Sequence, residues 1–389
     1  MRPIYLDYNA TTPVAPEVIE AMLPYLREHF GNPSSAHPYG HAAREVVERG
    51  RRAVGDLLHA DSDTIVFTGS GTESNNLAIE GVARTSHGER RHIITSAIEH
   101  PAVTEVCRWL GKQDFRVTTL PVDEYGWVRP EDLEREIGEE TLLVSVMHAN
   151  NEVGTIQPIA DLAEIAHRHG ALMHTDAAQA VGKIRVDVDA LGVDLLTVAG
   201  HKLYAPKGVG ALFVRPGVRI EPVLHGAGHE RGLRPGTEAV AQIAGLAAAA
   251  QLVARELITE TNHLRSRRDG LEAGLRRELG DQVVRVNGHP EQRLPNTLSV
   301  SFRGVRADAL LASIAERVAA SAGSACHAQD VRLSPVLSAM GVEREWGMGT
   351  LRLSVGRYTT DEEVDEALRV ISAGVLDATA AEDTETLRG

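Results

Sequence analysis

The feature that most constrains this fold is a long alternation of strand-like and helix-like segments between residues 41 and 214. Short apolar runs of strand length alternate with longer runs in which apolar residues recur at helical spacing. The predicted strands are 64–68, 92–96, 116–122, 141–147, 171–175, 195–199 and 211–214. The predicted helices are 41–58, 77–84, 102–110, 130–137 and 159–168. This alternation predicts a mostly parallel sheet with helices on both faces.

Polar residues follow nearly all of these strands, at the points where the strands end. They are residues 70–72, 99–100, 148–152, 176–179 and 201–202. Ligands of open parallel sheets bind outside the carboxyl ends of the strands. We therefore expect these five segments to form one pocket.

The segment 69–76, which reads GSGTESNN, leads from a predicted strand into a predicted helix. Free backbone N–H groups, the helix dipole and the Thr72 hydroxyl would favour an anion there, and a phosphate is the natural guest. A dinucleotide fingerprint needs a third glycine where Ser74 stands, and a P-loop needs a lysine that is absent. The segment thus favours a small phosphate over a nucleotide, with a simple capped helix start as the alternative.

Lys202 follows the apolar strand 195–199 directly, so its amine would lie beside apolar sheet. Desolvation favours the uncharged amine, which is the form that attacks carbonyl groups. Asp176 follows the predicted strand 171–175, which precedes 195–199 in the chain. The alternative interpretations are that Lys202 is an ordinary surface lysine and that Asp176 is a helix N-cap. A lysine, an acid and a phosphate loop at one sheet edge are what a pyridoxal phosphate enzyme needs, because the acid keeps the pyridine nitrogen protonated.

The overall composition narrows the range of partners. The chain has 389 residues and a formal net charge of −14, which argues against nucleic acid or an anionic membrane as partner. No run approaches the roughly 18 apolar residues of a membrane span, and the N-terminus lacks a signal-peptide apolar region, so a cytoplasmic location is expected. The two cysteines, Cys107 and Cys326, are too few for a disulfide framework or a zinc cluster, and no metal is expected.

A helical run at 239–279, with expected irregularities at its glycines 245, 270 and 274, precedes short strands and helices that form a smaller unit. We predict a large cofactor-binding domain at residues 16–256. The small α+β domain would comprise residues 1–15 and 257–389 and would carry Cys326.

Nine motifs of this chain resemble those of the cysteine desulfurases, which belong to the class V branch of fold-type I pyridoxal phosphate transferases. They occur in the family's order and are LDYNATTP (6–13), GTESNN (71–76), IEHPAV (98–103), HANNEVG (148–154), HTDAAQ (174–179), GHKLYAPKGVGAL (200–212), HERGLRPGT (229–237), SAGSAC (321–326) and RLSVGR (352–357). Within the family, SAGSACH is most similar to the enzymes that mobilise sulfur for iron–sulfur assembly.

The resemblance implies a site and a homodimer. Lys202 would form the Schiff base, Asp176 would pair with the pyridinium nitrogen, and His100 would stack on the ring and handle protons. The phosphate and ring oxygen would be held by Gly71, Thr72, Asn151, Gln179, His201 and, from a second subunit, Thr237. The substrate would be bound by Arg352, which clamps its carboxylate, and by Asn9, Ala10, Thr11 and Asn151.

The implied reaction converts L-cysteine to L-alanine and leaves the sulfur on Cys326 as a persulfide, for a sulfur-acceptor protein. Small residues precede Cys326 and polar ones follow it, which suits a reactive thiol on a wet loop. Cys107 lies within a predicted helix and is expected in the core. The alternatives are a selenocysteine lyase, another class V lyase or aminotransferase, and a non-catalytic partner that keeps the fold.

One position departs from the family pattern. Members usually carry a hydroxyl residue three positions before the lysine, and this chain has Ala199 there. One hydrogen bond to the phosphate would be missing, so we expect weaker cofactor binding than in relatives that have the hydroxyl.

Overall fold

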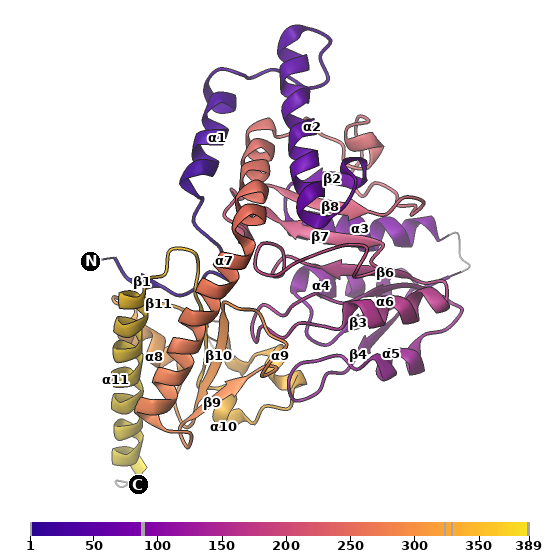
Figure 1. Ribbon diagram of the computed structural model, residues 1–389. Coiled ribbons are helices and arrows are strands. Elements are labelled where there is room, and N and C mark those ends of the chain that lie inside the picture. The colour runs from indigo at the N-terminus through magenta and orange to yellow at the C-terminus, as the bar shows by residue number, and fades with distance from the viewer. Residues whose placement is uncertain (1, 87–89, 323, 328–329, 387–389) are drawn as a thin grey trace.

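The computed structural model describes residues 2–86, 90–322, 324–327 and 330–386, and the side chains of these residues except 324–327, 330–332 and 381–386 (Figure 1). A large sheet with covering helices occupies one end of the molecule, and a smaller sheet with its own helices occupies the other. The long helix α7 (Val240–Leu279) runs from one to the other.

The large sheet has seven strands. Their order is β2 (Ile65–Thr68), β8 (Gly210–Val214), β7 (Leu195–Ala199), β6 (Leu172–Asp176), β5 (Thr141–Ser145), β3 (His92–Ser96) and β4 (Arg116–Leu120). Strand β8 runs antiparallel to both of its neighbours, and the other pairs are parallel. The mostly parallel sheet predicted from the sequence is confirmed, although β4 and β5 end two residues earlier than predicted.

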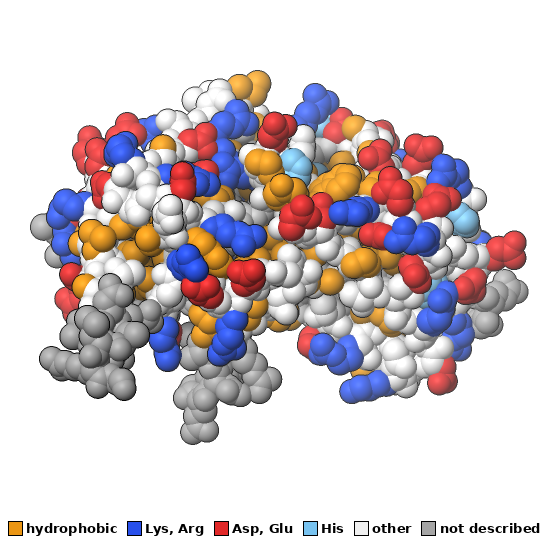
Figure 2. All heavy atoms as spheres, turned by 90° about the horizontal axis from the view of Figure 1, so that it is seen from below, with side chains coloured by type: hydrophobic (Ala, Val, Ile, Leu, Met, Phe, Trp, Pro, Cys, Tyr) orange, Lys and Arg blue, Asp and Glu red, His pale blue; other side chains and the backbone are white. Residues whose placement is uncertain are grey.

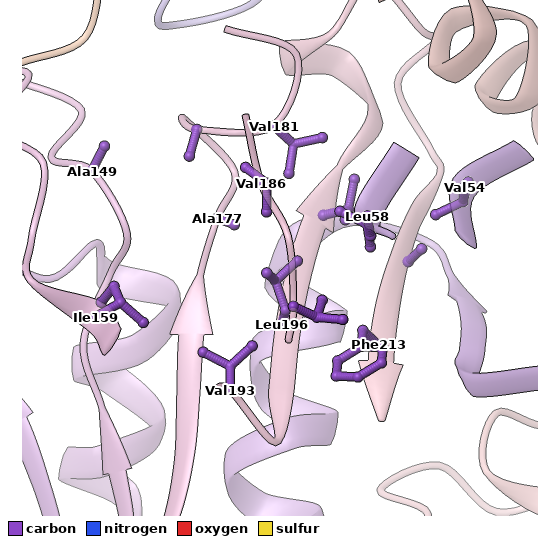
Figure 3. Close-up of a cluster of buried hydrophobic side chains, with 14 of the residues drawn as sticks. Val54, Leu58, Ala149, Ile159, Ala177, Val181, Val186, Val193, Leu196 and Phe213 are labelled. Carbon is purple, nitrogen blue, oxygen red and sulfur yellow. The ribbon is translucent and has the colours of Figure 1, made fainter. Parts of the chain in front are cut away.

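Helices cover both faces of this sheet because its strand residues alternate between two apolar layers. On β7, Leu195 packs with residues of α3 and α4, whereas Leu196 faces the opposite layer. Figure 3 shows Leu196 near Phe213 of β8 and Leu58 of α2. The helices of this part are α1 (Pro16–Arg27), α2 (Pro38–Leu58), α3 (Gly71–Thr85), α4 (Pro101–Gly111), α5 (Pro130–Glu136) and α6 (Ile159–Arg168).

Helix α7 is continuous, and the irregularities expected at its glycines are absent from this fully described helix. Two of the glycines instead permit close packing. A Cβ atom at Gly245 would meet Sδ of Met22 at 2.8 Å, and one at Gly274 would overlap the side chain of Leu368. Among the described helices α7 alone has the length and apolar character of a membrane span, but half of that apolar window is buried against the protein.

The smaller sheet is antiparallel, with the order β12 (Ser321–Ala322), β15 (Thr350–Ser354), β10 (Thr297–Phe302) and β9 (Val284–Asn287). Its helices are α8 (Ala307–Ile314), α9 (Pro335–Ala339), α10 (Arg344–Gly347) and α11 (Asp361–Thr386). The N-terminal strand β1 (Ile4–Tyr5) pairs in parallel with β11 (Val318–Ala319). Next to β12 in the chain, β13 (Ser324–His327) and β14 (Asp330–Leu333) form an antiparallel pair.

Two separate apolar cores contact α7. Its residues up to Val253 belong to the core of the large sheet, and those from Leu264 belong to the core of the smaller sheet. Leu6 joins the second core, while Ala15 joins the first. We propose accordingly that the domain at 16–256 and the domain at 1–15 with 257–389 meet between Val253 and Leu264 of α7.

The surface carries charges of both signs. On the face drawn in Figure 2, the described Lys and Arg side chains are interspersed with Asp and Glu. Positively and negatively charged side chains thus lie close together across this face.

Candidate active site

A cavity of about 350 Å³ lies where the strands of the large sheet end at their carboxyl side and meets the small sheet at Arg352. The predicted site residues that line it are Asn9, Ala10, Gly71, Thr72, His100, Asn151, Asp176, Gln179, His201, Lys202 and Arg352. Three predicted site residues do not line it or cannot be placed there. These are Thr11, Thr237 and Cys326.

Asp176 is the last residue of β6 and is 6% exposed. Its Oδ2 accepts a hydrogen bond from Nδ2 of Asn75 at 2.7 Å, and its Oδ1 accepts one from the N–H of Ala178 at 2.9 Å. Hydrogen bonds of this kind favour the ionised carboxylate. Asp176 is thus an oriented anion on the cavity wall.

Lys202 ends a short 3₁₀ turn, Gly200–Lys202, that follows β7. Its Nζ donates to the backbone oxygens of Asn9 at 2.5 Å and Ala10 at 2.8 Å. Burial lowers the pKa of Lys202 to about 8, with Arg352 adding to the fall and Asp176 opposing it. A lysine with this pKa supplies neutral amine near neutral pH, as a carbonyl nucleophile requires.

The start of α3 supplies an anion site beside the lysine. Ser70 caps the helix by accepting a hydrogen bond from the N–H of Glu73, and Gly71 and Thr72 follow on the cavity wall. A Cβ atom at Gly71 would lie 2.9 Å from Cβ of Ala199, so this close approach needs glycine. The helix begins at Gly71, six residues before the predicted start, because Ser70 satisfies its first turn.

The two cavity histidines are both neutral near pH 7. His100 caps α4, and its Nδ1 accepts a hydrogen bond from the N–H of Ala102 at 3.1 Å, so the ring proton lies on Nε2. Burial lowers the pKa of His100, with Asp176 opposing this and Lys202 adding to it. Burial and then the Lys202 charge lower the pKa of His201 to about 4. His201 would therefore meet a phosphate as a neutral donor.

Arg352 on β15 is the cation opposite Lys202, and its side chain is 12% exposed. One of its terminal nitrogens, Nη2, lies 2.7 Å from Oδ1 of Asp7 and donates to Oγ of Ser321 at 3.1 Å. The other, Nη1, donates to the backbone oxygen of Asn151 at 3.2 Å. These contacts hold the guanidinium plane in place at the mouth of the cavity.

A second carboxyl group lies behind the cavity. Glu99 is buried, and its Oε1 accepts hydrogen bonds from Oγ of Ser96 and from the N–H of Met147. Burial raises the pKa of Glu99 from 4.5 to about 8, and the charge of Asp176 raises it further. Glu99 is therefore protonated at neutral pH, which leaves Asp176 as the anion of this wall.

Three predicted residues lie elsewhere. Thr11 touches the site indirectly, because its Oγ1 lies 3.1 Å from Nδ1 of His201. Thr237 is exposed, three residues before α7. The backbone of Cys326 pairs with Val331 in the β13–β14 hairpin, but its side chain lies outside the described residues. Cys107 is buried in the core as predicted, and burial raises its pKa to about 12.

Sequence reasoning missed three residues that shape the site. Asn75 orients Asp176, Asp7 orients Arg352, and Glu99 is the neutral acid behind the wall. All three stand inside or beside motifs already singled out, so the only available signal was their position next to a predicted site residue. No group of three or more metal-ligating side chains occurs among the described residues.

The residues present fit pyridoxal phosphate. The close approach of Gly71 to Ala199 leaves the first turn of α3 open to an anion, and Asp176 provides the fixed carboxylate that a pyridinium nitrogen requires. Lys202 provides an amine of lowered pKa on the same cavity. Lysine, carboxylate and helix start thus occur together.

Comparison with known proteins gives one family. The Aminotransferase class-V family model matches residues 4–367. Cysteine desulfurase IscS of Methanosarcina thermophila is 46% identical over 369 residues, which are 95% of this chain and 91% of that protein. Cysteine desulfurase IscS 1 of Archaeoglobus fulgidus is 46% identical over 379 residues, with 96% and 97% covered.

Two solved structures are also similar. A NifS-like protein has a TM-score of 0.90 at 40% identity, with 96% of this chain and 99% of that one covered. The structure of SspA in complex with cysteine has a TM-score of 0.80 at 35% identity, with 92% and 100% covered.

Glu99 makes the stability of the protein depend on pH. Between pH 4.5 and about 8 the folded protein keeps a proton on Glu99 that the unfolded chain has released. The stability of the folded state therefore falls as pH rises through this range. Glu99→Gln keeps the acceptor for Ser96 and Met147 but cannot ionise. We expect its melting temperature, relative to the unmodified protein, to rise from pH 5 to pH 9.

The matched control is Glu105→Gln, an exposed carboxylate on α4. Its melting temperature should follow that of the unmodified protein across the same pH series. Parallel curves for Glu99→Gln and the unmodified protein would show that Glu99 is ionised in the folded state.

Ala199 lines the cavity beside the start of α3, so a hydroxyl there would face the anion site. We expect Ala199→Ser to bind pyridoxal phosphate about tenfold more tightly, the effect of one added charge-assisted hydrogen bond of about 1.5 kcal/mol. Equilibrium dialysis followed by absorbance measures this affinity. Ala199→Val, which adds bulk without a donor, should not bind more tightly. Unchanged affinity in Ala199→Ser would show that another group already fills this role.

Proposed function

The chain belongs to the class V aminotransferase family and is a pyridoxal phosphate-dependent cysteine desulfurase, and we propose that the cavity at Lys202 is where it takes sulfur from L-cysteine. The observation that carries this proposal is the convergence of Lys202, Asp176 and the start of α3 on one cavity. The substrate follows from the curated relatives, which are cysteine desulfurases, and from the neighbour solved in complex with cysteine.

The cofactor would be held at three points. Lys202 would bond it covalently, the carboxylate of Asp176 would face the ring nitrogen, and the N–H groups and hydroxyl at Gly71 and Thr72 would bind its phosphate. His201 adds a neutral donor at the phosphate. When bound, the cofactor supplies an electron sink for the bond-breaking steps at the substrate.

The proton movements fall to two side chains of this cavity. Nζ of Lys202, with its pKa lowered to about 8, can take the α-proton of the substrate as a neutral amine and return it to carbon. Nε2 of His100 carries the proton of that neutral ring, since its Nδ1 is occupied by the N–H of Ala102. His100 therefore acts as the acid and base near the substrate thiol.

Arg352 would bind the substrate carboxylate. Its guanidinium is already oriented by Asp7 and by the backbone of Asn151, so little freedom is lost when a carboxylate binds. Asn9, Ala10 and Thr11 would lie near the same end of the substrate. Asp7 also offsets the Arg352 charge, which eases release of product.

Cys326 would receive the sulfur. Its thiolate Sγ forms a bond to the substrate sulfur while the bond between that sulfur and Cβ of the substrate breaks. The electron pair of the broken bond stays with carbon, which is then protonated, so that L-alanine leaves and Cys326 keeps a persulfide. The small sheet favours this assignment. Ser321 of β12, five residues before Cys326, accepts a hydrogen bond from Arg352 at the cavity.

A protein or carrier thiol would take the sulfur from Cys326, for iron–sulfur assembly or another sulfur-transfer pathway. The reaction is expected in the cytoplasm. Selenocysteine lyase activity on the same scaffold is the alternative, and turnover of selenocysteine without turnover of cysteine would favour it.

Mass spectrometry tests the sulfur acceptor directly. After incubation with L-cysteine, the protein should gain the mass of one sulfur atom on the peptide that contains Cys326, and alanine should form. Cys326→Ser should keep the yellow colour of the bound cofactor and lose the added sulfur. Cys107→Ala is the matched control and should behave like the unmodified protein, because Cys107 is buried in the core. Undiminished sulfur release by Cys326→Ser would contradict the persulfide step.

A homodimer is the state in which Thr237 would serve a cofactor, because it is exposed and away from the cavity of its own chain. Apolar surface near α1 and α2 supports this proposal. Phe30 is 80% exposed and stacks on Tyr39, which is 60% exposed, at a ring separation of 5.7 Å. Leu26 on the same side is 61% exposed.

Sedimentation tests this dimer. The unmodified protein should have twice the chain mass of 41.9 kDa, and Phe30→Asp should shift it towards that single mass. The same variant should lose cofactor affinity as Thr237→Ala does, since each removes the phosphate contact of Thr237. Leu376→Asp, an exposed apolar position on α11, is the control and should leave the mass unchanged. A monomeric unmodified protein with full cofactor affinity would contradict the proposal.

A further inference from the structure

Lys183 is a buried lysine that contacts Gln179 on the wall of the cavity described above. Lys183 is 5% exposed. Its Nζ donates to two oxygens of Gln179, the side-chain Oε1 at 2.7 Å and the backbone oxygen at 3.1 Å. The turn that carries Lys183 is fixed as well, because Thr261 of α7 donates to its backbone oxygen. A buried cation with so specific a partner calls for an explanation, since burial of lysine is costly.

The hydrogen bonds of Gln179 are nearly all assigned within the protein. Lys183 takes the amide oxygen, and one amide N–H donates to the backbone oxygen of Asn9 at 3.0 Å. The second N–H of Gln179 has no partner among the described residues, and Gln179 lines the cavity. Because Lys183 holds Oε1, the second N–H is the group of this amide that remains for the cavity, and it is a hydrogen-bond donor.

We propose that Lys183 is a positioning residue, which locks the Gln179 amide so that a donor faces the anionic ring oxygen of the cofactor. If the Gln179 amide could rotate freely, its oxygen would face and repel the ring oxygen of the cofactor in half of the orientations. This inference rests on the proposed function, because it assigns Gln179 to the ring oxygen of pyridoxal phosphate.

The lock does not depend on the charge of Lys183. Burial lowers its pKa to about 7, with Lys202 and Arg352 adding to the fall and Glu260 opposing it. The neutral amine still has two N–H groups, and the two oxygens of Gln179 accept both. The amide of Gln179 is thus held in the same orientation on either side of this pKa.

The absorbance of the loaded protein reports on this donor. A donor to the ring oxygen stabilises its anionic form and weakens its hold on the proton of the Lys202 nitrogen, so the visible band titrates at a lower pH. Lys183→Met keeps the length and apolar stem of the side chain but removes the donor. We expect the pH midpoint of the visible band to rise by about one unit, with Gln179→Leu giving a rise of similar size.

The double variant separates positioning from a direct effect of charge. If Lys183 acts through Gln179, Lys183→Met should add less than half of its own shift when Gln179 is already leucine. An equal or larger added shift, or an unchanged midpoint in the folded Lys183→Met protein, overturns the inference. Melting of the cofactor-free variants checks folding, and Lys183→Leu carries the same comparison if Lys183→Met does not fold.

Failure of the proposed function and failure of the role of Lys183 give different results. An unmodified protein that gains no visible band with pyridoxal phosphate would refute the proposed function together with the inference. An unmodified protein that gains the band, with no change of midpoint in Lys183→Met, would refute only the role of Lys183.

Discussion

The site depends on one arrangement, a lysine withdrawn from water whose Nζ is held by two backbone carbonyl oxygens. Burial lowers the pKa of Lys202 and the charge of Arg352 adds to this, while the charges of Asp176 and Asp7 favour the charged amine. The resulting pKa of about 8 lies close to neutral pH. Both forms of the amine are then available, one for bonding to a carbonyl and one for carrying a proton.

The neighbouring charges follow from that lysine. Asp176 is held in place by hydrogen bonds to both of its carboxylate oxygens, while Glu99, behind the same wall, is kept neutral by burial, which raises its pKa. Oε2 of Glu99 has no hydrogen-bond partner among the described residues, whereas both carboxylate oxygens of Asp176 accept one. The two cavity histidines are neutral mainly because burial lowers their pKa values, and the charge of Lys202 adds to this fall. The charged side chains on the cavity wall include Lys202, Arg352 and Asp176, and Asp7 pairs with Arg352.

Much of this could be predicted from the sequence, because strand ends in a parallel sheet meet at one edge. The periodicity located the strands, and Asp176 and Lys202 followed from it. The anion-binding role of Thr72 followed from the strand-to-helix segment that carries it, whereas the roles of Gln179 and Arg352 came from family resemblance. Asn75 and Lys183 could not be predicted, because their importance lies in which side chain they contact. The glycines of α7 were misjudged for the same reason. Helix propensity treats glycine as a weakness, whereas Gly245 and Gly274 admit neighbouring side chains.

The contacts of Asn9 set the order in which the site can assemble. Asn9 is synthesised long before its partners, because its backbone N–H donates to Oγ of Ser354 and its side chain bonds to Thr297 and Asn296. Strand β1 likewise pairs with β11, more than 300 residues later in the chain. Synthesis runs from the N-terminus, so the carbonyl that holds Lys202 has no fixed place until the small sheet has been made. The large sheet can form while the chain is being synthesised, but the lysine site is completed only after β15 has been made.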